Sequence, residues 1–190
     1  MTVIGVQPEA QDEDDAKSID QPSMGLGLNS LLAESLYDTG RFRLVEHRDA
    51  AEREYLADLV LTHWKGRGAD YPISDLSAAW KKLGSDYLAY GSIQYARASK
   101  QGLRIGPFSR HKQILAVKAR ACLYTASWDQ PICQSGEGEA EEVGTGVVYV
   151  YDGDAIAFKK NAAGLATQRA ILAAAQKVAA VLGPIPTGGD

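Results

Sequence analysis

The sequence has few of the residues from which metal and redox sites are built. Its two cysteines are Cys122 and Cys133, and its three histidines are His47, His63 and His111. No second Cys or His lies two to four residues from either cysteine, which excludes the spacings of zinc and dithiol redox motifs. No histidine stands at a metal spacing or beside a Ser or Cys nucleophile motif. We therefore expect no catalytic residue, no metal and no cofactor.

The sequence also has no nucleotide-binding loop. Gly25–Ser30 resembles half of a dinucleotide loop, but Ser30 occupies the position of the third glycine. A long polar segment separates this stretch from the preceding strand, so its context is wrong as well. No phosphate-loop lysine motif is present, and Gly144-Thr-Gly146 precedes a predicted strand rather than a helix. These absences favour a protein that is not an enzyme.

A basic surplus and long apolar runs are absent too. The formal net charge is −4 at pH 7, which argues against a general nucleic-acid-binding protein. The apolar runs are far shorter than the roughly 20 residues of a membrane-spanning helix. Residues 1–20 have neither the basic leader nor the apolar core of a secretory signal. The sequence therefore leaves open a cytosolic protein and a secreted protein whose signal has been removed.

What is present is an ordinary globular composition, with 45% hydrophobic residues, in the order of an α/β domain. The predicted helices are 24–37, 46–64, 74–83 and 161–182, with Gly40 ending the first and Ser74 capping the third. The predicted strands are 2–6, 42–45, 87–95, 114–124, 132–142, 147–151 and 155–158. This order predicts a mixed, mostly antiparallel sheet with helices packed on it. We expect one domain over residues 1–183, with a mobile acidic loop at 7–23 and a flexible tail at 184–190.

Basic residues lie on the first strand of the predicted hairpin 114–142, and acidic residues lie on the second. All charged residues from 97 to 120 are basic, and all from 129 to 154 are acidic. Antiparallel pairing with Cys122 opposite Cys133 gathers the apolar side chains on one face and sets Lys118 opposite Glu137 on the other. That register makes the cysteines a candidate disulfide, which would indicate an oxidising compartment. Two free thiols are the alternative.

The basic residues farther out have no evident partners within the chain. They are Arg97, Lys100, Arg104, Arg110 and Lys112. One interpretation is that the charges only solvate the hairpin and fix its register. The other is that this basic arm contacts the acidic residues of a neighbouring copy, with Glu139, Glu141 and Glu142 as candidates. Such a head-to-tail contact builds rings or filaments.

Four stretches, in the same order along the chain, resemble the CsgG/HfaB family of curli- and holdfast-type secretion components. They are Leu36–Glu46 with its Gly-Arg-Phe, Ser85–Ile93, Gln113–Gly138 with its final Gly-Glu-Gly, and Ala166–Ile171. The resemblance implies a periplasmic, lipoprotein-like α/β domain held at the outer membrane and often assembled in a ring. In channel-forming members of the family, two hairpins extend from the domain to build a transmembrane barrel.

The sequence departs from the channel-forming pattern. The segment matching the first hairpin, 97–113, contains Arg104, Pro107, Arg110 and Lys112, and a charge at mid-bilayer costs several kcal/mol. The second candidate hairpin has arms of about five residues, half of the roughly 9–11 that a membrane strand needs. We therefore expect a periplasmic, outer-membrane-associated homo-oligomer that binds other protein chains without a clear membrane-spanning segment. The alternative is a monomeric periplasmic binding module that activates an envelope enzyme.

Overall fold

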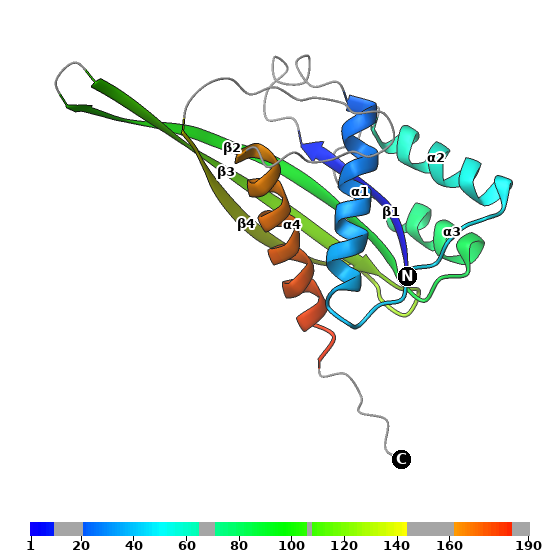
Figure 1. Cartoon of the computed structure of the whole chain (residues 1–190). Coiled ribbons are helices and arrows are strands. Elements are labelled where there is room, and N and C mark those ends of the chain that lie inside the picture. The colour runs from blue at the N-terminus through cyan, green and yellow to red at the C-terminus, as the bar shows by residue number, and fades with distance from the viewer. Residues whose placement is uncertain (10–20, 65–70, 106–107, 144–161, 184–190) are drawn as a thin grey trace.

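A computed structural model describes residues 1–9, 21–64, 71–105, 108–143 and 162–183. Its four strands form one sheet in the order β1–β2–β3–β4 (Figure 1). β1 is parallel to β2, and the other neighbouring strands are antiparallel. The strands are β1 (Thr2–Glu9), β2 (Leu88–Ile105), β3 (Phe108–Tyr124) and β4 (Ile132–Val143). The predicted fold class, a mixed and mostly antiparallel sheet with helices packed on it, is confirmed.

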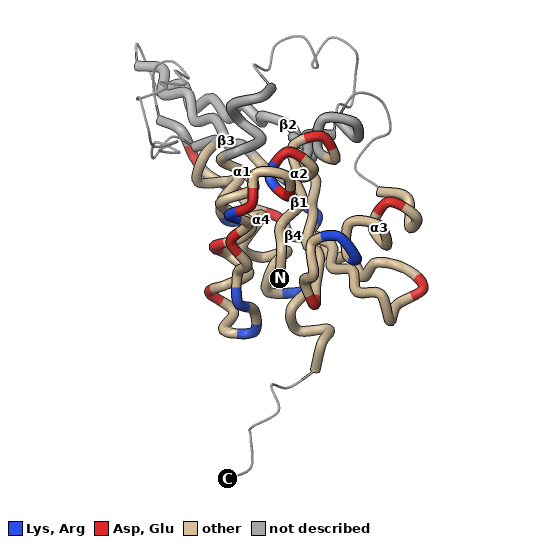
Figure 2. Tube along the Cα trace, turned by 90° about the vertical axis from the view of Figure 1, so that its right-hand side faces the viewer, with Lys and Arg blue, Asp and Glu red and all other residues tan. Residues whose placement is uncertain are grey.

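In the described ranges, four helices pack on the two faces of this sheet. They are α1 (Gln21–Tyr37), α2 (Ala50–Trp64), α3 (Ile73–Leu83) and α4 (Ala162–Ala180). α1 and α4 lie side by side on one face, and α3 lies on the other side of the strands (Figures 1 and 2). The domain is therefore a three-layer arrangement in which each face of the sheet has its own hydrophobic core.

The larger core lies between the sheet and the layer of α1 and α4. Leu28, Leu32 and Leu36 recur at helical spacing on α1 and are buried against the sheet. The strands contribute alternate residues, among them Ile93 and Val117, as expected when one face of a strand is buried. Burying each such large aliphatic side chain stabilises the fold by about 1.5–3 kcal/mol.

The second core lies under α2 and α3. Ile4 of β1 and Tyr90 of β2 are buried there with Leu76 of α3. The ring of Tyr90 meets that of Tyr71 edge to face, with centroids 5.0 Å apart. This core extends across β3 to Cys133 at the start of β4, and the acidic side chains farther along the same face of β4 are exposed.

α4 approaches β4 closely because both elements have small residues at the contact. Gly136 and Gly138 of β4 lie against the backbone of α4 near Ala170. A Cβ atom at either glycine would lie under 3.0 Å from backbone atoms of the helix. Small residues at these positions therefore set the depth at which α4 packs on the sheet.

Three predicted local features are wrong. Residues 42–45 form no strand, although Val45 N–H donates to the Met1 carbonyl at 3.0 Å. α2 begins at Ala50 instead of residue 46, because Asp49 Oδ1 accepts the N–H of Ala51 at 2.7 Å. Ser74 does not cap α3, whose N-cap is Pro72 without a side-chain hydrogen bond.

Other predicted boundaries shift or cannot be placed. β1 continues through residues 7–9, and α1 begins at Gln21, so both ends of the predicted 7–23 loop belong to regular elements. β2 and β3 run past the predicted limits at 95 and 114. Residues 10–20, the predicted hairpin at 147–158 and the tail at 184–190 lie outside the described residues.

Candidate interaction surface

The register of β3 and β4 is the one that the charge pattern predicts. Lys118 lies opposite Glu137, and Cys122 lies opposite Cys133. The apolar positions of β3 meet the small residues of β4, so that Val117 is opposite Gly138. One face of this strand pair therefore packs under α4, and the other carries the charged side chains.

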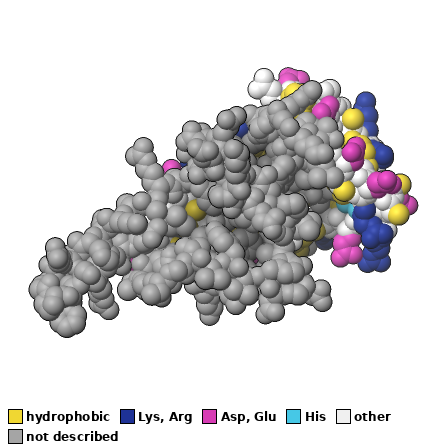
Figure 3. All heavy atoms as spheres, turned by 90° about the horizontal axis from the view of Figure 1, so that it is seen from above, with side chains coloured by type: hydrophobic (Ala, Val, Ile, Leu, Met, Phe, Trp, Pro, Cys, Tyr) yellow, Lys and Arg dark blue, Asp and Glu magenta, His cyan; other side chains and the backbone are white. Residues whose placement is uncertain are grey.

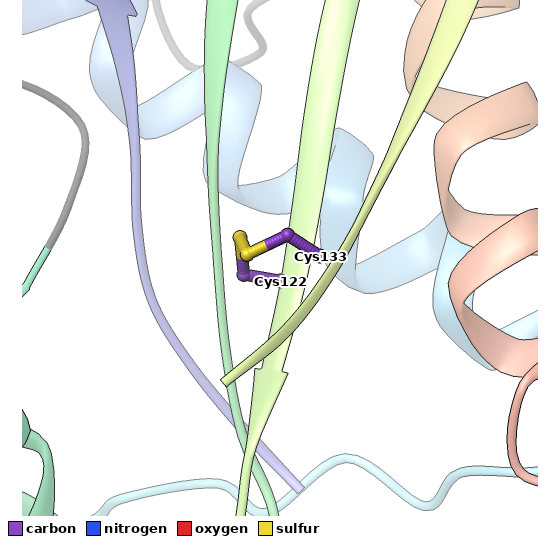
Figure 4. Close-up of a disulfide and its surroundings, with 2 residues drawn as sticks. All are labelled: Cys122 and Cys133. Carbon is purple, nitrogen blue, oxygen red and sulfur yellow. A yellow bond between two sulfur atoms is a disulfide. The ribbon is translucent and has the colours of Figure 1, made fainter. Parts of the chain in front are cut away.

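A disulfide joins Cys122 and Cys133 across the two strands (Figure 4). Cys122 is buried in the second core, and Cys133 is partly exposed at its margin. The bond closes the end of the hairpin, where Trp128 packs on Tyr87 with ring centroids 5.9 Å apart. The disulfide thus ties β3 to β4 beside their turn, and the contact of Trp128 with Tyr87 places that turn against the start of β2.

β4 carries a row of exposed carboxylates, which we call the acidic row: Glu137, Glu139 and Glu141. These residues alternate with Gly136, Gly138 and Ala140, which face α4. Alternate residues of a strand share a face, so the three carboxylates project from the side of the sheet away from α4. The acidic row is therefore exposed on the face of β4 opposite to the one that α4 covers.

β2 and β3 continue past the end of β1 as a distal arm, defined as residues 97–105 and 108–113, and Gly102–Ile105 with Phe108–His111 lie beyond β4 as well (Figure 1). The arm begins at a bulge, since Ala96 pairs with Ala116 and Ala98 with Leu115, which leaves Arg97 as the extra residue. β1 pairs with β2 only as far as Gln94. The arm therefore reaches about 36 Å past the end of that pairing.

The sequence of the distal arm contains five basic residues and no Asp or Glu. They are Arg97, Lys100, Arg104, Arg110 and Lys112. In the register, Lys112 lies opposite Val143 and Glu142 lies opposite Gln113. Lys112 and Glu142 therefore occupy positions on opposite faces of the strand pair, and the structure does not pair them. Arg104 and Arg110 lie near the tip, where β2 and β3 pair with each other.

The structure does not bring the tip of the distal arm to the acidic row of the same copy. Glu139 lies opposite Ala116, and Arg110 is farther along β3 by about 20 Å. β2 and β3 pair continuously from Ala98 with Leu115 to Ile105 with Phe108, so the tip stays at that distance along the ribbon in this structure. Of the candidate interaction residues, Arg104 and Arg110 are therefore separated from Glu139 and Glu141 within one chain.

A chain of hydrogen bonds that is buried at one end and partly exposed at the other is a feature that sequence analysis missed. Thr2 Oγ1 lies 2.7 Å from His47 Nε2, and His47 Nδ1 lies 2.9 Å from Glu52 Oε2. Ser85 Oγ forms a short hydrogen bond with Thr2 Oγ1. Thr2 and Ser85 are far in the sequence from each other and from the His47–Glu52 pair, and the four residues match no local motif, so no pattern could have identified them.

The order hydroxyl, imidazole, carboxylate is also that of an activated nucleophile. Here, however, Thr2 and Ser85 are each only 2% exposed, so their hydroxyls are closed to a substrate in this structure. These hydrogen bonds instead link the start of β1, the loop before α2 and the loop before β2. We assign it a structural role.

A shallow groove of about 540 Å³ lies beside α2 and α3, lined by Glu54, Tyr55 and Asp58 of α2 and Lys82 of α3. The Lys82 ammonium lies 4.0 Å from the centre of the Tyr55 ring, within cation–π range. Burial, followed by the nearby Asp75 and Asp58 carboxylates, raises the pKa of Tyr55. Seen from above, this end of the molecule shows basic, acidic and apolar side chains intermixed (Figure 3).

In the described part of the chain, no group of three or more His, Cys, Asp or Glu side chains is arranged to hold a metal ion. The same residues include no helix with the length and apolarity required to cross a membrane.

No known protein family has a model that matches this chain, and no curated protein matches it. Solved structures similar to it include the hypothetical protein CT253 from Chlamydia trachomatis, with a TM-score of 0.46 and 10% sequence identity, covering 95% of this chain and 93% of that chain. Another is the lipoprotein GNA1162 from Neisseria meningitidis, with a TM-score of 0.37 and 16% identity, covering 77% of this chain and 85% of that chain.

Proposed function

We propose that this chain is a non-enzymatic component of a bacterial cell envelope that acts by binding protein chains. In this proposal it is a periplasmic, CsgG/HfaB-like subunit associated with the outer membrane, and it assembles into a ring or another oligomer. The observation that carries the proposal is the distal arm. Its last four residue pairs, Gly102–Ile105 with Phe108–His111, are bonded only to each other among the described strands.

A two-stranded ribbon is marginally stable in water, because it buries little apolar surface. The rest of the sheet is stabilised by helices on its faces, but the arm extends past them (Figure 1). Contact with another protein surface supplies the stabilisation that the ribbon lacks. The arm is therefore best explained as a binding element.

The disulfide between Cys122 and Cys133 supports the proposed location. Disulfides persist in oxidising compartments such as the bacterial periplasm and are rare in the reducing cytosol. The resemblance of four stretches to the CsgG/HfaB family supports the same compartment.

The test is photo-crosslinking in the bacterium that makes the protein. A photoreactive residue replaces Ser109 on the distal arm, and the matched control replaces Ser127, which is exposed in the turn between β3 and β4. We expect the arm position to give adducts with protein chains in the periplasmic or outer-membrane fraction, and the control position to give few. The mass of the adduct distinguishes the two hypotheses, because a self-assembling subunit crosslinks to a copy of itself and a monomeric module crosslinks to an envelope enzyme.

A shortened-arm variant provides the second readout. Asn-Gly replaces residues 99–114, joining the paired residues Ala98 and Leu115 through a tight turn. The body should keep its fold, because the helices pack on the remaining sheet, while association is lost. A protein that stays in the cytosol with two free thiols and gives no arm adducts would overturn the proposal.

A further inference from the structure

We propose that Arg169 and Lys177 of α4 close the outer edge of β4, so that an extended segment of another chain cannot add to the sheet there. β4 is an edge strand, because among the described strands it pairs only with β3. Such an edge offers a row of main-chain donors and acceptors to any strand that meets it. The distal arm takes no part in this closure, which therefore goes beyond the proposed function.

The register shows which main-chain groups of β4 point away from β3. The Cα atoms of Cys122 and Cys133 lie 4.0 Å apart, as in an antiparallel pair that exchanges no main-chain hydrogen bonds. β4 pairs with β3 without a bulge, so every second residue after Cys133 has the same orientation. The outward carbonyls facing the middle of α4 are therefore those of Ser135, Glu137 and Glu139.

Two basic side chains of α4 occupy the first and the third of these carbonyls. Arg169 Nη1 donates to the Glu139 carbonyl at 2.5 Å, and Lys177 Nζ donates to the Ser135 carbonyl at 2.9 Å. An added strand needs the same acceptors, because it forms its hydrogen bonds with alternate residues of the edge. It would therefore have to displace both basic side chains.

The spacing of the two basic residues matches that of the two carbonyls. Arg169 and Lys177 are eight residues apart on α4, which is a rise of about 12 Å. Ser135 and Glu139 are four residues apart on β4, which is about 13 Å along the strand. Both contacts can therefore form together without bending the helix or the strand.

α4 is held at the depth that this cover requires. A Cβ atom at Gly136 or Gly138 would lie under 3.0 Å from backbone atoms of α4, so the helix lies directly on β4. Ala173 lies midway between the two basic residues, and its methyl group cannot donate to the carbonyl of Glu137. That single acceptor between two covered ones is too little for a strand to pair with.

The other edge strand, β1, also gives a main-chain group to the helix packed on it. Asn29 Oδ1 of α1 accepts the N–H of Val6 at 2.5 Å. α1 packs on β1 and α4 packs on β4, on the same face of the sheet (Figure 1). A polar side chain from the adjacent helix thus occupies main-chain groups at both edges, which supports closure as the role of Arg169 and Lys177.

The experiment measures strand addition to the full chain with its disulfide intact. The probe is a fluorescent peptide with the sequence of residues 114–124, which pairs with β4 in the fold, and it carries Cys122→Ser. The Arg169→Ala, Lys177→Ala variant should bind it roughly tenfold more tightly than the unaltered protein, as measured by fluorescence anisotropy. Hydrogen exchange should then show new protection of the amides of β4.

Two matched controls separate the cover from other effects of the substitutions. Gln168→Ala with Gln176→Ala changes two exposed side chains of the same helix. Arg53→Ala with Lys81→Ala removes two positive charges from exposed positions on α2 and α3. Both controls should bind the peptide as weakly as the unaltered protein, because Arg169 and Lys177 are intact.

A conservative exchange tests the donors themselves. Arg169→Lys with Lys177→Arg keeps a donor at both positions and should keep the edge closed. Circular dichroism and thermal unfolding check that each variant folds. If the double alanine variant does not fold, the single variants Arg169→Ala and Lys177→Ala decide, since each should bind the peptide more tightly than the unaltered protein.

The proposed closure is overturned if removal of the basic side chains does not tighten peptide binding, or if either control binds as tightly as the double alanine variant. It is also overturned if the exchange variant opens the edge, or if the bound peptide protects a segment other than β4. The crosslinks from position 109 test the proposed function separately, because that position lies on the distal arm.

Discussion

Gly138 of β4 lies directly against Ala166 of α4, so closely that a Cβ atom on the glycine would overlap the alanine carbonyl oxygen. Helix and strand both present backbone at this contact, and backbone cannot move aside as a flexible side chain can. The absence of a side chain at Gly138 is therefore a requirement of the helix–sheet packing.

Gly138→Ala should lower the free energy of unfolding by about 1–3 kcal/mol, because the added methyl group forces α4 away from the sheet. Chemical denaturation measures this change. The control is Glu137→Ala at the neighbouring residue, which projects into solvent and should have little effect. Equal stability of the two variants would show that α4 does not pack this closely.

Loss of the disulfide between Cys122 and Cys133 should destabilise the fold by about 3 kcal/mol, since the bond closes a loop with a sequence separation of 11. The Cys122→Ala, Cys133→Ala double variant and the reduced protein should both unfold at lower temperature. Mass measurement under non-reducing conditions, after alkylation of the native protein, checks the bond itself. Incorporation of two alkyl groups would contradict the structure.

Thr2→Val should destabilise the fold by about 1–3 kcal/mol, because it removes the hydroxyl that links His47 and Ser85 in a buried site. Thr2→Ser keeps the hydroxyl and should recover most of the stability. The comparison variant is Thr39→Val. The Thr39 hydroxyl donates to the Leu36 carbonyl at 2.6 Å in a more exposed place, so its loss should destabilise the fold less. Thermal unfolding, at about 2–4 °C for each kcal/mol, measures all three.

The raised pKa of Tyr55 predicts a dependence of stability on alkaline pH. The folded state holds the phenol proton more tightly than the unfolded chain, whose tyrosine pKa is near 10.0. The contribution of the Tyr55 proton to the free energy of unfolding is therefore complete below pH 10, and it is lost as the pH rises through the raised pKa of the folded state. Tyr55→Phe should remove this part of the dependence. Asp58→Asn should lower the tyrosine pKa slightly, as measured by absorbance titration of the tyrosinate, and an unchanged titration would contradict the predicted effect of Asp58.

The sequence predicts the sheet best where apolar and charged residues alternate strictly. Between Val117 and Leu123 every second residue is apolar, and a shift of one residue would bury Lys118. That constraint is strong enough to give the register with β4. The fold class follows from the same kind of pattern, because the helical spacing of Leu28, Leu32 and Leu36 is equally regular.

The residue pattern of the distal arm does not predict its strands, because its alternation is weak, and only the family resemblance matches 97–113 to a hairpin. Ser99, Lys100 and Gln101 are three consecutive polar residues, so neither face of β2 is marked as buried. Conversely, residues 42–45 have a strand-like composition, yet Leu44 and Val45 are each 43% exposed. In both places the local sequence pattern does not decide whether a strand forms.

The contact between Thr2 and Ser85 closes a separation of 83 residues, and β1 has no partner strand until the segment after Ser85 has been synthesised. During translation the first strand must therefore wait while α1, α2 and α3 emerge from the ribosome. Pairings between distant segments form slowly, because the intervening chain has to lose its freedom first. We expect the parallel pairing of β1 to be a late step of folding, with its apolar residues in need of protection until then.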